Sequence, residues 1–378
     1  MKEKNNVIWI LLTLFFGGLV SGVLIFKQQQ FYKSQNIVLE EILLGQAELE
    51  ESIRKSSLVV LMSNILDKVD DELKEHPGSG LTEETIGRIA ALSYSFEPYS
   101  YKEGDSLATK KATKKATRKY SPERGQLLLA LANMRMDSIS FRKIKMKTSF
   151  SGAALRGANL EGFDLSGIDL RGANLKEADL RRTDLTKAEL MEVNLWGANM
   201  RAANLEGANL RRANMAWVDL KDGELRNSVM TGVDLTSAKL GGLDFSGVDL
   251  RFADLTNVFL NGANLAGVKM KGTVFRKANL TAANFSNASV RNTDLKFAIL
   301  KNADFSGADL SGADLSQADL NQVNFSGAEF YKVTFEEKKW FKKLQEWQAQ
   351  GIEKIGGKYE ISKDLTNVSN YWLLPIKK

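Results

Sequence analysis

The chain has 378 residues, of which 43% are hydrophobic and 26% are charged, values typical of a folded protein and not of a disordered one. It contains no cysteine, which excludes disulfides, thiolate metal sites and a cysteine nucleophile. Its one histidine, His76, precedes Pro77 and Gly78 at the end of a helical pattern, where a solvated residue is the simplest interpretation. The sequence therefore predicts no catalytic triad, no metal site and no cofactor.

Residues 7–26 form an uncharged apolar segment that follows a short tail at residues 1–6. Its 20 residues are enough for a helix to cross the hydrocarbon layer of a membrane, which is roughly 30 Å thick. A cleaved signal peptide is the alternative, but its apolar core usually has only about 7–15 residues. We predict an uncleaved transmembrane helix and a single-pass membrane localisation. About two cationic residues flank each end, so the side of the membrane stays open.

Residues 27–97 have the pattern of an α-helical juxtamembrane region, and a second helix within them is expected to begin after Thr82. Apolar residues recur at helical spacing along one stripe of the first helix. Packing against a neighbouring helix is one interpretation of this stripe, and self-association through a coiled coil is the other. The stripe consists of Leu58, Met62, Ile65, Val69 and Leu73.

The formal net charge of +6 comes from segments outside residues 148–335, which hold about 22 acidic and 21 basic residues. The densest basic run lies in residues 98–121, which we interpret as a flexible linker because the run is of low complexity and lies between prolines. A solvated loop is one interpretation of its charge, and attraction to anionic lipid or nucleic acid is the other. The basic residues of the run are Lys110, Lys111, Lys114, Lys115, Arg118 and Lys119.

From Phe150 to Phe335 every fifth residue is large and apolar, which gives about 38 repeats in one register. Two residues earlier stands a small residue, and the residue between is usually Asp or Asn, as in Ala158-Asn159-Leu160. A period of five suits neither an α-helix, on which successive apolar residues would turn by about 140°, nor a flat strand, on which they would alternate faces. Each repeat instead fits one side of a polygonal coil whose small and large residues point inward.

Stacked coils of this kind would pair as parallel strands about 4.8 Å apart, and each fully buried apolar side chain would contribute roughly 2 kcal/mol. Proline would interrupt the pairing, and none occurs between Pro122 and Pro375. Glycine at the second turn position, as in Gly157, eases the tight bend. The pattern weakens over residues 222–230, where the register continues but a bulge of the surface is expected.

The motif Ala-Asp/Asn-Leu-x-x, as in residues 153–177, resembles the pentapeptide-repeat family in its bacterial type and covers half of the chain. The resemblance implies a mainly β fold over residues 148–335, a right-handed quadrilateral β-helix with four repeats, or about 20 residues, in each coil. The solenoid would have about nine coils and a length of roughly 45 Å. One inner column would hold Phe245, Leu265, Phe285, Phe305 and Phe325.

The open ends of a solenoid expose strand groups and apolar side chains, so both ends are expected to be capped. Ser121 and Pro122 have the pattern of a helix start, and residues 122–147 are predicted to cap the first coil. Residues 336–378 are predicted to form a C-terminal helix and a capping tail. The apolar stripe of that helix consists of Trp340, Phe341, Leu344 and Trp347.

A coil of about 20 residues aligns several cationic residues along one outer edge. Neutralisation by acids such as Asp249 and Asp294 is one interpretation of this edge, and a docking ridge for an acidic partner is the other. Trp196 and Trp217 occupy outward positions at one corner of adjacent coils, which indicates a contact surface or packing against a flanking helix. The cationic edge consists of Arg171, Arg211, Arg251, Lys271 and Arg291.

A filled β-helix has no cavity, and catalysis needs one. The sequence therefore favours a membrane-anchored protein–protein interaction scaffold without enzymatic activity, whose protein partner it does not identify. One alternative is the binding of nucleic acid or anionic lipid through the basic linker and the cationic edge. The other is DNA mimicry, by which some pentapeptide-repeat proteins inhibit DNA gyrase. The nearly neutral repeat region argues against mimicry, and nucleic acid is not the expected partner.

Overall fold

The computed structural model describes residues 52–76, 80–99, 119–134, 136–336, 339–363 and 370–376. They belong to two compact units, one ending at Leu61 and the other beginning at Met62. A helix covers residues 52–75. Met62 and Val69 of its predicted apolar stripe are buried within this chain, which favours the packing interpretation of the stripe over the coiled coil.

The predicted transmembrane helix at residues 7–26 lies outside the described residues. Within the ranges given above, no helix is both long and apolar enough to cross a bilayer. The longest of these helices, at residues 52–75, carries charged residues such as Arg54, Lys55 and Asp67, which would have to be desolvated in the hydrocarbon layer. This finding contradicts the predicted single-pass membrane localisation.

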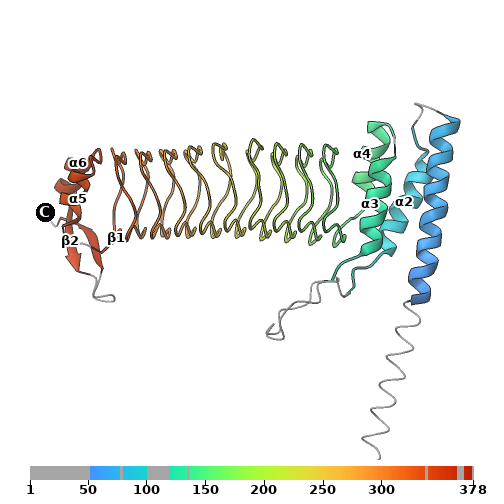
Figure 1. Cartoon of the computed structure of the whole chain (residues 1–378), viewed down its shortest axis with the longest axis horizontal. Helices are drawn as coiled ribbons and strands as arrows, with labels where there is room; N and C mark the ends of the chain where they lie inside the picture. The colour runs from blue at the N-terminus through green and yellow to red at the C-terminus, as the bar shows by residue number, and fades with distance from the viewer. Residues whose placement is uncertain are drawn as a thin grey trace, which may run out of the picture. The chain divides into compact units, whose positions relative to one another are not determined.

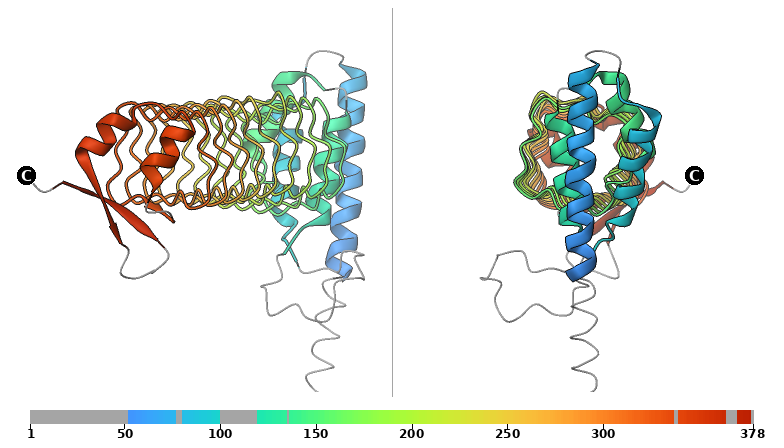
Figure 2. Two further views of the ribbon diagram at one scale, coloured as in Figure 1. Left: turned by 60° about the vertical axis from the view of Figure 1, so that its left-hand side comes forward. Right: turned by 90° about the vertical axis from the view of Figure 1, so that its right-hand side faces the viewer.

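Residues 148–336 wind into stacked coils that superimpose when they are viewed along the stack (Figures 1 and 2). Outward residues pair in parallel with the residue 20 positions further on, as Ala154 does with Asn174 and Asp314 with Thr334. One coil therefore consists of four repeats, and the predicted repeat solenoid is confirmed. Each side of a coil pairs through one bridging residue and not through the strands that a mainly β fold implies, because a two-residue turn follows every three residues.

We number the five positions of a repeat so that the large apolar residue is position 5. Position 5 is buried in every repeat of the stack, and the small residue at position 3 is buried in nearly all of them. The rings of Phe285 and Phe305 stack with centroids 4.5 Å apart, and those of Phe305 and Phe325 with centroids 5.7 Å apart. Phe245 and Leu265 are fully buried as well, so the predicted inner column is confirmed.

The Asp or Asn at position 4 holds the turn that follows it. Its Oδ1 accepts a hydrogen bond from the backbone N–H of position 1, two residues further on. Asp164 accepts from Ser166 in this way at 2.9 Å, and Asn284 accepts from Ser286 at 3.0 Å. Position 1 is the one position of a repeat whose amide donates to no backbone carbonyl in the stack. The side chain at position 4 therefore accepts the hydrogen bond of the position 1 N–H, which has no backbone acceptor in the neighbouring coils.

Position 2 adopts the left-handed backbone conformation in every repeat, with φ between 52° and 75° from Gly152 to Lys332. Glycine occupies 16 of these 37 positions, and the other 21 hold residues with a side chain. An L-residue pays roughly 1–2 kcal/mol for this conformation. The geometry of the coil therefore imposes the turn, and glycine only makes it easier.

After the helix at residues 52–75, three more helices of the described ranges precede the first coil. The helix α2 begins after its N-cap Thr82, as the sequence predicts (Figure 1). The segment before α3 takes the place of a preceding coil. Ser121, the N-cap of α3, donates its backbone N–H to the carbonyl of Gly152 at 2.7 Å and accepts from the N–H of Ala154 at 3.0 Å. The helices are α2 (Glu83–Ser95), α3 (Pro122–Asn133) and α4 (Ser138–Lys147).

The end of the last coil, β1, joins two later strands in a small antiparallel sheet with the order β1-β3-β2, and two short helices lie between β1 and β2 in the sequence (Figure 1). Residues 347–350 have the backbone conformation, burial and pairing of a further repeat. Gln348 has a φ of 55°, Ala349 is buried, and Gln350 pairs in parallel with Asn324. Trp340 is buried and its ring stacks on that of Phe335 at 4.7 Å. The elements are β1 (Thr334–Phe335), α5 (Trp340–Glu346), α6 (Ile352–Lys358), β2 (Tyr359–Lys363) and β3 (Tyr371–Pro375).

The variant Phe305→Ala should test the packing of the inner column. We expect it to lower the free energy of unfolding by about 3–5 kcal/mol, because the stacked rings on either side hold the cavity open. Guanidinium unfolding of the full-length chain would measure the loss. Ser306→Ala, at the next position outside the coil, should change stability by less than about 0.5 kcal/mol. A loss below about 1 kcal/mol for Phe305→Ala would contradict a closely packed interior.

A second prediction concerns the contact between α2 and α4. Lys143 and Lys147 donate hydrogen bonds to Glu83 at 2.7 and 2.6 Å, and these bonds lower the pKa of Glu83 from 4.5 to about 2. A carboxylate with a lowered pKa stabilises the fold above its unfolded pKa, and this contribution is lost as the pH falls through the folded pKa. The difference in free energy of unfolding between the wild type and Glu83→Gln should therefore be constant at neutral pH. It should shrink as the pH falls from 4.5, the ordinary pKa of Glu83, to about 2, its pKa in the fold.

Urea unfolding at a series of pH values would measure this difference. In the background Lys143→Ala/Lys147→Ala, the same substitution of Glu83 should have no such pH dependence, because the two donors are gone. A difference between the wild type and Glu83→Gln that persists unchanged down to pH values near the folded pKa would show that the two lysines do not hold this carboxylate.

Candidate interaction surface

Side chains fill the interior of the described coils, so contacts with other molecules are confined to the outside of the stack. Within the same residues, no group of three or more His, Asp or Glu side chains is arranged to hold a metal ion. The chemistry that the stack can offer is therefore that of its outward positions 4, 1 and 2. These positions repeat every 20 residues along the stack and form its faces and corners.

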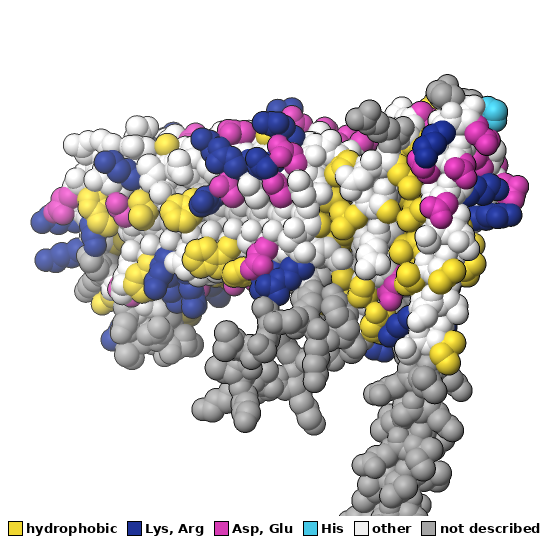
Figure 3. Space-filling model, turned by 45° about the vertical axis from the view of Figure 1, so that its right-hand side comes forward, with side chains coloured by type: hydrophobic (Ala, Val, Ile, Leu, Met, Phe, Trp, Pro, Cys, Tyr) yellow, Lys and Arg dark blue, Asp and Glu magenta, His cyan; other side chains and the backbone are white. Residues whose placement is uncertain are grey.

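The predicted cationic edge lies on the outside of the stack, and three of its four arginines are paired with carboxylates. Figure 3 shows basic and acidic side chains next to one another along an edge of the stack. Arg211 and Lys271 are exposed. These contacts favour the interpretation that nearby acids neutralise the edge. The pairs are Arg171–Asp169 at 2.8 Å, Arg251–Asp249 at 2.6 Å and Arg291–Asp309 at 2.8 Å.

The carboxylates of Asp169 and Asp249 are held in the ionised form. The hydrogen bond from Arg251 lowers the pKa of Asp249, and the same bond raises the pKa of Arg251. Partial burial acts to raise the pKa of Asp169, but hydrogen bonds from Arg171 and Ser149 outweigh burial and lower it. Both pairs therefore keep their charges and neutralise one another, whereas Arg211 and Lys271 have no carboxylate oxygen within 4.0 Å among the described residues.

The two tryptophans lie at one corner, as the sequence places them. Trp217 is 61% exposed, and Trp196 is 37% exposed with Lys176 Nζ 4.8 Å from its ring centroid. Trp217 occupies position 2 with a φ of 63°. A bulky residue adopts this conformation only under strain, and here its side chain gains little burial in return. An exposed aromatic residue in a strained position is a candidate contact residue.

The basic linker falls largely outside the described part of the chain. Lys119 is described and exposed, and its neighbour Tyr120 pairs with Tyr99. The proposed role of the linker in binding phosphates stays a prediction. The linker residues outside the described ranges are Lys110, Lys111, Lys114, Lys115 and Arg118.

The ladder of coils is interrupted at one place, where the sequence pattern weakens. Every position 4 from Ala154 to Asp314 pairs with the residue 20 positions further on, except Glu224. The amides of Asp222 and Leu225 have no backbone partner at this junction of coils. The register nevertheless continues, because Leu225 and Met230 are buried, as predicted for residues 222–230.

A hollow of about 390 Å³ opens beside this interruption. Gly241 has no side chain and leaves a gap at this corner. Lys221 of the preceding coil and Asn261 of the following coil line the gap. Asp219 Oδ2 lies 3.8 Å from Arg201 Nη1 and 3.5 Å from Lys239 Nζ. Two cations thus share one carboxylate. The residues that line the hollow include Arg201, Asp219, Lys221, Lys239, Gly241 and Phe259.

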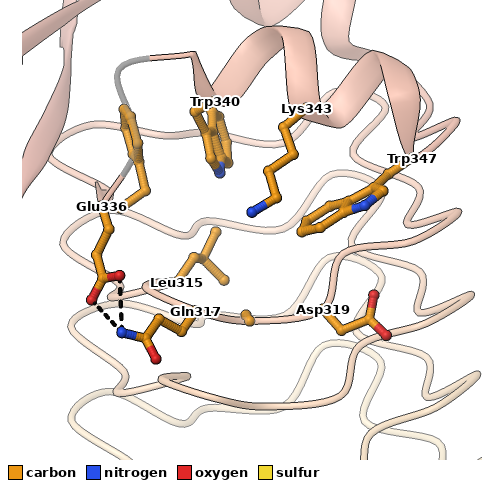
Figure 4. A pocket seen from close by; sticks show the side chains of 9 residues that line it. Leu315, Gln317, Asp319, Glu336, Trp340, Lys343 and Trp347 are labelled. Carbon is orange, nitrogen blue, oxygen red and sulfur yellow. Dashed lines mark hydrogen bonds between the residues drawn. The ribbon is translucent and has the colours of Figure 1, made fainter.

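A second hollow, of about 340 Å³, lies where α5 covers the last coil (Figure 4). Its polar groups already contact one another. Gln317 Nε2 donates to both carboxylate oxygens of Glu336, at 2.8 and 2.9 Å. Lys343 Nζ lies 4.6 Å from the ring centroid of Trp347. We therefore assign this hollow to the packing of the C-terminal cap.

The family model of pentapeptide repeats matches the chain in 8 copies. The chain belongs to the pentapeptide-repeat family. The matched segments follow one another through the whole stack, and they match a repeat and not a catalytic domain. This supports a non-catalytic repeat protein. The segments are residues 148–186, 188–227, 228–265, 260–296 and 298–336.

Solved structures of other pentapeptide-repeat proteins are similar to this chain. HetL, involved in heterocyst differentiation regulation in Nostoc sp. strain PCC 7120, is 34% identical; the match covers 47% of this chain and 82% of HetL, with a TM-score of 0.39. QnrB1, a plasmid-mediated fluoroquinolone resistance protein, is 18% identical. The match covers 50% of this chain and 95% of QnrB1, with a TM-score of 0.39. A protein of the Arabidopsis thaliana thylakoid lumen is 26% identical over 29% of this chain and 74% of its own, with a TM-score of 0.23. No curated protein matches the chain.

Sequence reasoning missed the hollow beside Gly241. Its signal is present in the sequence, because Lys239 and Phe259 stand at position 4, where most repeats have Asp or Asn. Glycine also occupies both turn positions at 241 and 242. The cations around this hollow come from two neighbouring columns, so a pattern within one column does not reveal them.

The variant Trp217→Gly should show whether Trp217 is available to a partner or packs against the stack. We expect stability to stay equal or to rise by about 1 kcal/mol, because glycine adopts the left-handed backbone without strain and the indole is mostly exposed. The urea midpoint of the full-length chain would measure the change. A loss of more than about 1 kcal/mol would mean that Trp217 packs the stack and is not available to a partner.

Proposed function

We propose that this pentapeptide-repeat chain is an interaction scaffold that binds a protein partner on the outside of its stack. The filled interior is the observation that carries this proposal. Position 5 is buried in every repeat from Phe150 to Phe335, so the repeats offer a stiff outer lattice of side chains. Enzymatic sites usually need a concave pocket with converging polar groups, and the inside of the coils supplies none among the described residues.

The tryptophan corner is the favoured contact within this proposal. Trp196 and Trp217 combine exposure with large apolar area, and such residues often dominate the binding energy of interfaces. The cationic edge is the second candidate. Three of its four arginines already bind carboxylates of the chain itself, so a partner would have to compete with those bonds.

A DNA-mimic role is less favoured. DNA carries one negative charge per about 1.7 Å of its axis. The repeat region holds about 22 acidic and 21 basic residues and thus has almost no net charge. Its surface therefore lacks the dense negative field that would compete with DNA for a basic groove.

Affinity capture with the full-length chain from a lysate of its source cells would test the scaffold. We expect a defined set of proteins to be retained by the wild type and reduced at least tenfold by Trp196→Ala/Trp217→Ala. Phe252→Ala is the matched control, because Phe252 is 62% exposed and has a φ of 60° at the same repeat position on another corner. Equal capture by the wild type and the double variant would contradict the tryptophan corner. Capture of nothing above the level of a heat-denatured sample would contradict the scaffold.

A further inference from the structure

We propose that one face of the stack binds an acidic segment of a partner protein through lysine side chains and free backbone amides around the hollow at Gly241. This inference rests on the scaffold function proposed above and names the chemistry of the partner. We call the surface the Lys239 face. Its central column consists of position 4 residues that pair from coil to coil, namely Lys239, Phe259, Asn279 and Ile299.

The Lys239 face carries cations and no acid across four consecutive coils. Two of its five cations, Arg276 and Lys296, bind carboxylates of the next face. Lys277 and Lys301 have no carboxylate oxygen within 4.0 Å among the residues that the structure describes. Lys239 reaches only Asp219, at 3.5 Å. The face therefore keeps a positive charge that the chain does not neutralise. The four acid-free segments are residues 236–242, 256–262, 276–282 and 296–302.

Backbone amides on this face lack the acceptor that other turns supply. Asn279 accepts from the N–H of Thr281 at 3.2 Å in the usual way. At the other three repeats of the column, position 4 holds Lys, Phe or Ile, whose side chains have no oxygen to accept such a bond. Within the described residues, the amides two positions further on have no hydrogen-bond partner. These amides belong to Gly241, Asn261 and Lys301.

A carboxylate from a partner would supply the missing acceptor. In most turns of the stack, the chain's own Asp or Asn oxygen binds this amide, so the local geometry already suits an oxygen ligand. Bonds between a carboxylate and ammonium or amide donors are about twice as strong as neutral hydrogen bonds. Gly241 and Asn261 both line the hollow that Lys221 and Lys239 border. Two of the three free amides and two lysines therefore belong to residues around one hollow, while Lys301 and its amide lie further along the same face.

Apolar side chains adjoin the cations. Phe259, Phe297 and Ile299 are 49%, 46% and 45% exposed. Phe297 stands at position 2 with a φ of 60°, which is the strained and exposed arrangement of Trp217. An interface that joins apolar contacts to a charged rim is typical of protein partners.

The dimensions suit an extended peptide that runs along the stack. Three steps between coils separate Lys239 from Ile299, which is about 14 Å at the usual strand spacing. An extended chain rises about 3.4 Å per residue, so the same distance takes about four residues. The segment would place acidic residues at the hollow and an apolar residue about four positions away. Asp219 and Asp319 bound the column at its two ends, so the positive patch is short and suits a short acidic segment better than the long, evenly charged backbone of a nucleic acid.

Fluorescence anisotropy with the full-length chain would test this proposal. The probe is a labelled twelve-residue peptide with six Glu and with two Phe placed four positions apart, and the matched probe has Gln in place of Glu. We expect the Glu peptide to bind, with weaker binding at high salt, and the Gln peptide to bind at least tenfold more weakly. The double variant Lys239→Glu/Lys301→Glu should lose at least tenfold in affinity. Lys187→Glu/Lys271→Glu, an equal charge change elsewhere on the stack, should lose less than twofold.

The variant Gly241→Leu should fill the hollow without reversing a charge. A Cβ at this position would meet Asn261 Oδ1 at 3.0 Å, and that side chain is exposed and can move. We expect an affinity loss of at least fivefold. Ser286→Leu, at the same repeat position on another corner, should bind as the wild type does. Unfolding midpoints of all variants would confirm that they fold.

Amide hydrogen exchange gives an independent measurement. The Glu peptide should slow exchange at Gly241, Asn261 and Lys301, and the Gln peptide should not. Binding that is equal in all variants, or no binding by the wild type, would overturn the proposal. Tighter binding of a single-stranded oligonucleotide that the same double variant abolishes would also overturn it, in favour of nucleic acid. If the peptide fails while capture still depends on Trp217, the acidic partner is refuted and the scaffold stands.

Discussion

The structure depends on one geometric constraint, namely that each five-residue side sends two side chains inward and must then turn. The inward pair fills the coil, and the turn leaves one amide without a backbone partner. The Asp or Asn at position 4 accepts from that amide, while position 2 takes the left-handed conformation. The inner apolar column, the outer polar residue and the strained turn are therefore three consequences of the same closed coil.

This constraint leaves function to the places where the outer residues depart from the pattern. An Asp at position 4 accepts a hydrogen bond from its own turn. An arginine two residues further on often forms an ion pair with that Asp, as Arg251 does with Asp249. Lys239, Phe259 and Ile299 accept no bond from the amide of their own turn, and Lys239 reaches only Asp219, at 3.5 Å. They leave amides, charges and apolar area available at one face, beside the only junction of coils in the described stack where position 4 does not pair. Their column pairs from coil to coil without a break, and the hollow at Gly241 lies beside Lys239 and Phe259.

Much of the solenoid was predictable from the sequence, because a period of five excludes helix and strand and determines which residues point inward. The inner phenylalanine column followed from the 20-residue coil and is present. The pairing of the arginines was not fully predictable, since Arg291 binds Asp309 on the following coil and not the expected Asp294. Residues 347–350 were missed as a further repeat because an insertion shifts their register.

The membrane localisation inferred from residues 7–26 is contradicted, and those residues lie outside the described ranges.

Residue-resolved amide hydrogen exchange across residues 150–335 of the full-length chain would test the closed coil most directly. Protection should follow a five-residue period, with its minimum at position 1, and should be lost in addition at Asp222 and Leu225, whose amides lack partners. Continuous protection over long stretches, as in a helix, or a rapidly exchanging interior would contradict the account.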